Sequence, residues 1–240
     1  MIYYRHSKNR GASSARNTGI RNSKGEYFAF LDDDDEWFPE KLEKQVNLLN
    51  TSRHEVGLVY CWMCYVKNDI VLTNYTPRLK GYIFKDMLDK QGIGNSSTLL
   101  VKRKVIDRVG FFDESLLRGN DGDFIRRVSR VFYIDFVHEV LVKVHANHGL
   151  PRISDDTIPS VNNVIKSLKI RFEKFPDDIE EYPKEFASIC LFIAYNYVKI
   201  RKFKSSLFWS LKAIAFAPLS VFVYKRIINL FMEAFSYSIK

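Results

Sequence analysis

Cysteine is scarce in this sequence, and its scarcity argues against a protein held together by disulfides. Only three occur, at Cys61, Cys64 and Cys190, an odd and sparse set that argues against a disulfide framework and for a reducing compartment. Cys61 and Cys64 have the spacing of a redox or half-zinc motif, but they lie inside VGLVYCWMCYV. This β-branched and aromatic run predicts a buried strand, and no second cysteine pair completes a zinc site.

Long uninterrupted apolar runs are also missing. After residue 155 the chain is rich in Phe, Leu, Ile and Ala, but lysines and arginines keep each apolar run below the roughly 18 residues that a membrane-spanning helix needs. The first residues, MIYYRH, are too few and too polar for a signal peptide. We therefore expect a cytoplasmic protein. Packing within the protein is the favoured role of the C-terminal apolar residues, and peripheral contact at the inner face of the membrane is the alternative.

Acidic residues are outnumbered, with 28 against 37 basic residues and a formal net charge of +9. A basic balance suits an anionic partner, such as nucleic acid, an anionic membrane surface or a phosphorylated small molecule. The basic residues are dispersed along the chain, and no zinc-finger or RNP-type signature accompanies them. We therefore expect no nucleic-acid partner.

Two regions differ in their pattern. Residues 1–154 alternate short apolar strands with polar-faced helices, which predicts an α/β domain, whereas residues 155–240 predict helices alone. In the first region we expect strands at Met1–His6 and Glu26–Leu31, a helix at Ser13–Ser23, and a helix from Pro39 whose buried face carries Leu42, Val46 and Leu49. In the second we expect helices at Phe186–Ile200, Phe203–Phe216 and Leu219–Ile239.

An acidic cluster, Asp32-Asp33-Asp34-Asp35-Glu36, follows the predicted strand at Glu26–Leu31. In open α/β sheets, ligands bind beyond the carboxyl ends of the strands. Carboxylates this close repel one another unless a cation neutralises them, so the cluster favours a hard metal ion such as Mg²⁺ or Mn²⁺. A solvated acidic turn before the next helix explains the same residues, because acidic side chains are favourable near a helix N-terminus.

The segment from Asn9 to Leu42, NRGASSARNTGIRNSKGEYFAFLDDDDEWFPEKL, resembles the core of the family 2 glycosyltransferases. Further on, Gly110–Glu114 (GFFDE) and Asn120–Asp123 (NDGD) resemble two later motifs of that family, although the family often has Glu-Asp where this chain has Asn-Asp. The resemblance implies a GT-A, Rossmann-like mixed sheet. It also implies an inverting transfer of a sugar from a nucleotide-diphosphate donor to the hydroxyl of a saccharide or lipid-linked acceptor, in surface polysaccharide or glycan synthesis.

The resemblance also implies roles for single residues. Asp121 would be the catalytic base, while Asp34, together with Asp32 and His145, would bind a divalent Mn or Mg ion. The donor would contact five residues: Arg10, Arg16, Asn17, Asp32 and Arg152. Two alternatives remain open, because Asp121 also fits a helix N-cap and a histidine in a β-rich loop is often structural. The loop Gly94–Thr98 resembles an acceptor-side loop but is also ordinary turn chemistry.

A GT-A domain normally opens with a strand-helix-strand unit that holds the nucleotide base, and this chain begins at what resembles a later strand. We therefore expect a domain truncated at its N-terminus that lacks its first strands. The alternative to an active enzyme is an inactive or split-gene fragment that binds no donor by itself. Hydrolysis by paired carboxylates is disfavoured, because it leaves the local clustering of aspartates unexplained.

Overall fold

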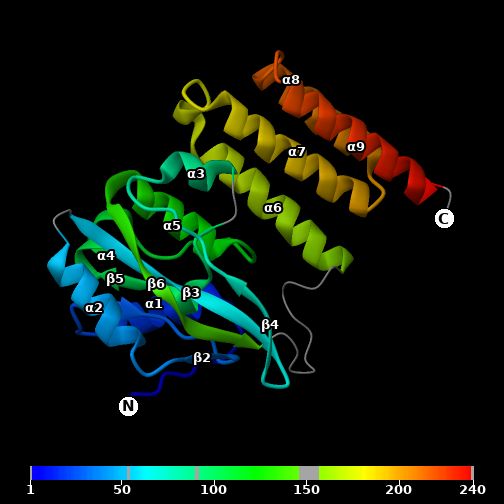
Figure 1. Cartoon of the computed structure of the whole chain (residues 1–240). Coiled ribbons are helices and arrows are strands. Elements are labelled where there is room, and N and C mark those ends of the chain that lie inside the picture. Colours follow the sequence, from blue (N-terminus) through cyan, green and yellow to red (C-terminus); the bar gives the residue numbers. More distant parts are fainter. Residues whose placement is uncertain (1, 53–54, 90–91, 146–156, 239–240) are drawn as a thin grey trace. The chain divides into compact units, whose positions relative to one another are not determined.

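The computed structural model describes residues 2–52, 55–89, 92–145 and 157–238 (Figure 1). The chain forms two compact units. The first comprises residues 1–115 and 120–151, and the second comprises residues 116–119 and 152–240.

Within its described residues, the first unit is built on a mixed sheet of six strands. Its strands are β1 (Tyr27–Ala29), β2 (Asp35–Trp37), β3 (Val56–Lys67), β4 (Ile70–Tyr75), β5 (Leu100–Lys102) and β6 (Tyr133–His145). The order along the sheet is β1-β5-β3-β6-β2, and β4 pairs with β3. Among the strands described, β3 and β6 form the one parallel pair, and the other pairs are antiparallel. The predicted α/β class with a mixed sheet is confirmed.

Strand β3 is the centre of the sheet. One of its edges pairs with β6 along nearly its whole length, while the other pairs first with β5 and then with β4. Alternate side chains of a strand point to opposite faces, so Leu58 and Tyr60 enter one hydrophobic cluster while Val59 and Cys61 enter clusters on the other face. Burial on both faces explains why VGLVYCWMCYV is continuously apolar, as the sequence predicted.

Helices cover both faces of this sheet. The helical segments of the first unit are α1 (Ala12–Asn22), α2 (Lys41–Thr51), α3 (Phe84–Asp89), η1 (Ser96–Thr98), α4 (Arg103–Val109) and α5 (Asn120–Val131). Ile20 of α1, Val105 of α4 and Phe124 of α5 pack into the cluster around Leu58 and Tyr60. Leu49 of α2 joins the cluster on the opposite face.

The N-terminal elements match the expectations only in part. The helix expected at Ser13–Ser23 is confirmed as α1, and the strand expected at Glu26–Leu31 is shorter because β5 pairs with only three of its residues. The strand expected at Met1–His6 is wrong for the described residues, since 2–10 form no strand. Ile2 and Tyr3 are 75% and 81% exposed, so this segment gains neither ladder hydrogen bonds nor burial.

Helix α2 buries two of the three expected apolar residues, Leu49 fully and Val46 partly, together with polar residues that the spacing does not indicate. Leu42 is 41% exposed, whereas Lys41 and Gln45 are fully buried beside Leu49. Lys41 Nζ donates to Gln45 Oε1 at 2.8 Å and lies 4.1 Å from the centre of the Trp37 ring. Burial lowers the pKa of Lys41 to about 8. Polar contacts therefore set the rotation of this helix, and hydrophobic spacing alone does not reveal them.

The buried Lys41 predicts a pH-dependent stability. Unfolded lysine has a pKa of 10.5, so between about pH 8 and 10.5 the folded state holds fewer protons at this residue than the unfolded state, and raising the pH favours folding. We expect the free energy of unfolding of the wild type, relative to Lys41→Met, to rise by up to about 3 kcal/mol across this window. Urea unfolding of both proteins at several pH values measures it.

Lys44→Met on the same helix is the matched control, because Lys44 is accessible and pairs with Glu139. Its difference from the wild type should stay flat up to about pH 10. A flat difference for Lys41→Met as well would show that Lys41 is solvated and protonated in the folded protein.

Residues 157–238 of the second unit form helices joined by short connections. Its helical segments are α6 (Ile158–Lys174), η2 (Pro176–Asp178), α7 (Pro183–Lys199), α8 (Phe203–Phe216) and α9 (Val221–Ser238). The last three confirm the helices expected at Phe186–Ile200, Phe203–Phe216 and Leu219–Ile239 to within a few residues. Phe172 of α6 contacts the rings of Phe186 and Trp209, which join three helices in one core. Within the residues described, no helix has both the length and the apolarity to cross a membrane.

Candidate active site

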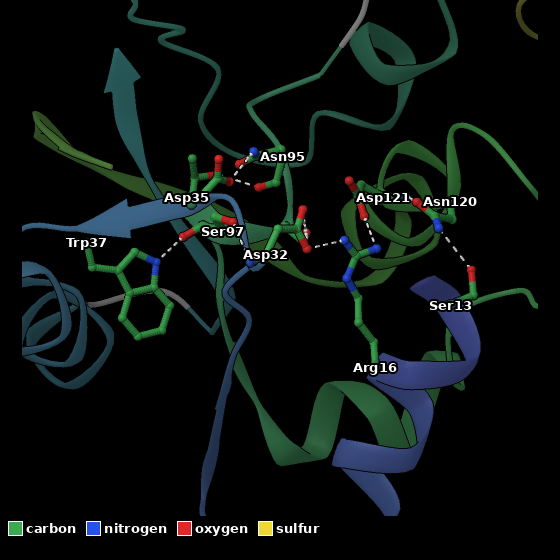
Figure 2. Close-up of polar contacts among 11 residues, drawn as sticks. Ser13, Arg16, Asp32, Asp35, Trp37, Asn95, Ser97, Asn120 and Asp121 are labelled. Atoms are coloured by element: carbon green, nitrogen blue, oxygen red, sulfur yellow. Dashed lines mark hydrogen bonds and ion pairs between the residues drawn. The ribbon is translucent and has the colours of Figure 1, made fainter. Parts of the chain in front are cut away.

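Four segments of the first unit bring polar side chains together at one place. They are helix α1, the acidic loop after β1, the loop that leads into η1, and the N-terminus of α5 (Figure 2). Asp32 is the first acidic residue after β1, and Asp121 lies in the first turn of α5. The fold thus joins motifs that are about a hundred residues apart in the sequence.

Arg16 links the two acidic residues. Its Nη2 donates to Asp32 Oδ1 at 2.6 Å, and its Nη1 donates to Asp121 Oδ1 at 2.9 Å (Figure 2). The Arg16 side chain is 11% exposed, against 34% for Asp32 and 23% for Asp121. Burial lowers the pKa of Arg16, but the charges of Asp121 and Asp32 outweigh this effect and raise it, so the guanidinium stays protonated. One buried cation therefore serves two carboxylates.

Asp121 has the properties of a carboxylate that can accept a proton. Burial raises its pKa above the usual 3.8; the charge of Arg16 acts in the opposite direction, and that of Asp32 raises it further. A raised pKa makes a carboxylate a better proton acceptor, provided it remains ionised at the working pH. Asn120, the residue before it, donates from Nδ2 to Ser13 Oγ at 3.0 Å, which ties the start of α5 to α1.

The loop Asn95–Thr98 holds the acidic loop in place. Ser96 Oγ donates to Asp32, at 3.3 and 3.2 Å from its two oxygens, and Ser97 Oγ accepts from the Asp32 backbone N–H at 3.1 Å. The Trp37 indole donates to the Ser97 carbonyl at 2.8 Å. The sequence indicated this loop only weakly, and its contacts with Asp32 give it a definite positioning role.

Asp35 and Asn95 form a second polar pair that sequence reasoning did not assign to the site. Asn95 Nδ2 donates to Asp35 Oδ2 at 2.9 Å, and Asp35 is 8% exposed. Burial raises the pKa of Asp35, hydrogen bonds from Ser97 and Asn95 lower it, and the nearby charges of Asp32 and Asp34 raise it. The carboxylates of the cluster therefore destabilise one another as anions. The signal for Asp35 was present in the unbroken run of four aspartates.

Asn17 and Arg10 lie beside the GFFDE segment. The Asn17 side chain is buried, where its Nδ2 donates to Phe112 O and Glu114 Oε1, both at 2.9 Å, and its Oδ1 accepts from Phe112 N at 3.0 Å. Arg10 Nη2 lies 3.3 Å from Glu114 Oε2 and is largely exposed. Asn17 thus acts here as a clamp between α1 and this segment, and the donor contacts expected of both residues stay predictions.

The remaining expected residues lie in different places. His145 ends β6, and its Nε2 is 3.0 Å from Glu36 Oε1 of β2, while Asp34 is half-buried in the acidic loop. Arg152 lies outside the described residues. Across the part of the chain that the structure covers, no three Asp, Glu, His or Cys side chains form a ready-made metal-binding group. The metal ligands Asp34, Asp32 and His145 therefore also stay predictions.

The position of Arg16 predicts a change in pH dependence. Removing the cation in Arg16→Met removes the effect that lowers the pKa of Asp121, so that pKa rises further. If Asp121 must be ionised for transfer, the acid limb of the kcat/KM profile moves to higher pH in the variant. Initial rates measured across the acid limb test this shift, whatever the height of the remaining activity.

Arg21→Met on the same helix is the control, because the half-exposed Arg21 lies 3.9 Å from Glu114 and over the Phe111 ring. Its acid limb should coincide with that of the wild type. An acid limb that stays in place, or moves to lower pH, in Arg16→Met would mean that the titrating group is not Asp121.

The fold has counterparts among solved structures. TarS from S. aureus, crystallised with UDP-GlcNAc, matches with a TM-score of 0.51 over 95% of this chain and 72% of that chain, at 14% sequence identity. Another crystal structure of TarS matches with a TM-score of 0.51 over 94% of this chain and 36% of that one, at 15% identity. At these identities the comparison shows the fold alone, which is the GT-A glycosyltransferase fold expected from the sequence.

Sequence comparison matches part of the chain to one family. Residues 1–110 match the family described as glycosyl transferase family 2. An uncharacterized glycosyltransferase of Rickettsia prowazekii is 35% identical over 153 residues, which cover 60% of this chain and 48% of that protein. The E. coli UDP-Glc:alpha-D-GlcNAc-diphosphoundecaprenol beta-1,3-glucosyltransferase WfgD is 24% identical over 197 residues, covering 80% and 70% respectively. Residues 1–110 therefore resemble glycosyltransferase family 2, and these two relatives are named as glycosyltransferases.

The matches cover only part of each Rickettsia relative. The chain spans about half the length of the R. prowazekii relative and 27% of a second one, from Rickettsia felis, to which it is 33% identical over 172 residues. The family assignment therefore concerns the glycosyltransferase region, and the substrates of the whole protein belong to the proposal that follows.

Proposed function

We propose that this chain transfers a sugar from a nucleotide-diphosphate donor to an acceptor hydroxyl with inversion at the anomeric carbon. The observation that carries the proposal is the Asp32–Arg16–Asp121 arrangement, which unites a carboxylate of the acidic loop, a buried cation and a carboxylate of raised pKa. Each of the three comes from a motif that resembles family 2, so family and geometry indicate the same chemistry.

Asp121 is the proposed base. It accepts the proton of the acceptor hydroxyl while that oxygen attacks the anomeric carbon from the side opposite the nucleotide, and the bond to the nucleoside diphosphate breaks. One displacement inverts the configuration. Arg16 keeps one oxygen of Asp121 in place through its 2.9 Å hydrogen bond, which orients the other oxygen of the carboxylate.

Arg16 and Asp32 are the proposed donor-binding residues nearest to the base. A guanidinium suits a diphosphate because its planar N–H groups can donate to two phosphate oxygens at once. When a donor enters, its phosphates would compete with Asp32 for Arg16, and Ser96 would still hold Asp32. Arg10, Asn17 and Arg152 remain proposed donor contacts on the resemblance alone.

The acidic loop fits a divalent ion that arrives with the donor. Mg²⁺ and ions like it are usually held by one or two carboxylates together with substrate phosphates and water, so a complete protein cage is not needed. Asp34 and Asp32 supply such carboxylates, and the buried Asn95 Oδ1 has no hydrogen-bond partner within the described residues. The ion would neutralise charge on the leaving nucleoside diphosphate. His145 is the proposed third ligand.

The relatives suggest the class of acceptor. WfgD acts, by its name, on a sugar linked to diphosphoundecaprenol, and TarS was crystallised with UDP-GlcNAc. We therefore propose a saccharide or lipid-linked acceptor in surface polysaccharide or glycan synthesis, with a uridine donor as the first to test. Cys61, Cys64 and Cys190 are all free and buried, which supports a cytoplasmic, reducing location.

Calorimetry on the purified chain tests donor binding. Mn²⁺ alone, UDP-sugars alone and the two together are titrated separately, followed by the corresponding GDP-sugars. We expect heat of binding for one donor that depends on the ion. No binding by any combination would reject a working donor site in these residues and would favour the fragment alternative, in which further chain is needed.

A further inference from the structure

Helix α8 carries apolar side chains on its exposed face. Leu207, Phe208 and Leu211 are 46%, 60% and 56% exposed, and Lys204 is exposed one turn before Phe208. Positions 204, 208 and 211 follow the four- and three-residue spacing of one helix face. The opposite face is buried through Trp209 and Ala213, so α8 is apolar on both sides. A helix in contact with water on one face normally carries polar residues there.

Helix α9 repeats the pattern. Val221, Ile228 and Met232 are exposed on one face, and the exposed Lys225 lies among them at the same spacing. Val223, Ile227 and Leu230 are buried on the other side. Helices α8 and α9 contact each other as well as α7. We call the exposed residues of these two helices the α8–α9 surface. Its large apolar members within the described side chains are Phe203, Leu207, Phe208, Leu211, Val221, Phe222, Tyr224, Ile228, Phe231 and Met232.

The charge on this part of the chain has one sign. From Phe186 to Met232 the sequence contains no Asp or Glu, and it contains seven basic residues: Lys199, Arg201, Lys202, Lys204, Lys212, Lys225 and Arg226. Residues 186–232 therefore carry a net charge of +7. A partner that covers the α8–α9 surface must be apolar where the side chains are apolar and anionic beside them.

We propose that the α8–α9 surface binds an anionic lipid membrane, with both helices lying in the interface. Aromatic and aliphatic side chains enter the boundary between headgroups and acyl chains, while Lys204 and Lys225 extend to the anionic headgroups. A second copy of the chain fits less well, because two copies of this surface would bring Lys204 and Lys225 against like charges, and residues 186–232 contain no Asp or Glu. The inference goes beyond sugar transfer, since it concerns where the enzyme is held.

Vesicle flotation with the whole chain tests the proposal. Vesicles of phosphatidylcholine alone are compared with vesicles that contain phosphatidylglycerol, at low and high salt. We expect the protein to float with the anionic vesicles, and the bound fraction to fall as salt screens the charges. Equal binding to both vesicle types, or none to either, would overturn the proposal. The readout needs neither donor nor acceptor, so it can fail while the proposed function stands.

Two double variants separate the apolar from the electrostatic contribution. Phe208→Ser with Leu211→Ser should lower the partition coefficient at least about tenfold. The matched control is Ile70→Ser with Leu72→Ser on β4, whose side chains are 67% and 56% exposed; it should bind as the wild type does. Binding that survives the α8 variant and is lost in the β4 variant would move the site away from the α8–α9 surface.

Lys204→Gln with Lys225→Gln removes two charges from the surface and should weaken binding to anionic vesicles about thirtyfold. Lys8→Gln with Lys24→Gln removes the same net charge from exposed positions in the first unit, and should bind as the wild type does. Equal losses in both variants would indicate attraction by net charge alone. Sedimentation velocity tests the alternative of a second copy. If the wild type is a dimer that binds no vesicles, and Phe208→Ser with Leu211→Ser converts it to a monomer, the α8–α9 surface is a contact between two copies of the chain.

Discussion

Asp121→Asn is expected to reduce sugar transfer about 10²- to 10⁴-fold, the typical contribution of a general base. The substitution keeps the size of the side chain, and an amide oxygen can still accept the hydrogen bond from Arg16, so the geometry around α1 should persist. What is lost is the ability to take up a proton. Release of nucleoside diphosphate in the presence of acceptor measures the loss, and calorimetry should show donor binding largely intact.

The stability of this variant distinguishes a catalytic Asp121 from a structural one. Because burial raises its pKa, the ionised Asp121 disfavours the folded state at neutral pH, so Asp121→Asn should not lower the free energy of unfolding. Asp107→Asn at an exposed position of α4 is the control and should leave both rate and stability unchanged. Asp121 lies inside the first turn of α5 and is therefore not its N-cap, which corrects that alternative. An Asp121→Asn protein that unfolds readily yet transfers sugar at the wild-type rate would support a structural role for the Asp121 charge, because acidic side chains are favourable in the first turn of a helix.

Asp34→Ala is expected to weaken metal-dependent donor binding about 100-fold or more. The reason is that the ion would be held through few protein carboxylates, so the loss of one leaves little beyond the phosphates of the donor. Loss of residues that merely support a metal ligand already costs about 10- to 100-fold in metal affinity. Calorimetric titration of donor at a fixed Mn²⁺ concentration gives the two dissociation constants to compare.

Asp33→Ala is the matched control, because it removes the same charge from the neighbouring, exposed residue of the same loop. If the effect were a general loss of negative charge, both variants would weaken binding equally. A 100-fold effect confined to Asp34 would support a specific ligand, whereas equal affinities in the wild type and Asp34→Ala would exclude Asp34 as one.

The sequence predicted those parts of the fold where local pattern and tertiary environment agree. The run VGLVYCWMCYV is buried on both faces as β3, and the helices α7 and α8 follow their apolar periodicity because the second unit buries it. The failures have a physical cause in each case. A strand at Met1–His6 would need a partner strand, and no described strand pairs with this segment. In α2, Lys41 and Gln45 are buried although they are polar, so a search for apolar spacing does not find them.

The site could be predicted as a set of motifs but not as an arrangement. The resemblance selected Arg16, Asp32 and Asp121 separately, yet no spacing in the sequence shows that one guanidinium joins the two acids. The roles of Ser96 and Asn95 were hidden for a similar reason, since they act through contacts with residues about sixty positions away. Contacts at such separations depend on how the strands are ordered in the sheet.

Helix α1 has a consequence for the design of chimeras with related proteins. Three of its residues within five positions, Ser13, Arg16 and Asn17, contact Asn120, Asp121 and the Phe112–Glu114 segment respectively. One face of this short helix thus contacts and positions both later motifs. A chimera that takes those two motifs from a relative should take α1 from the same relative. The three segments contact one another in the folded protein, although about a hundred residues separate α1 from the two motifs in the sequence.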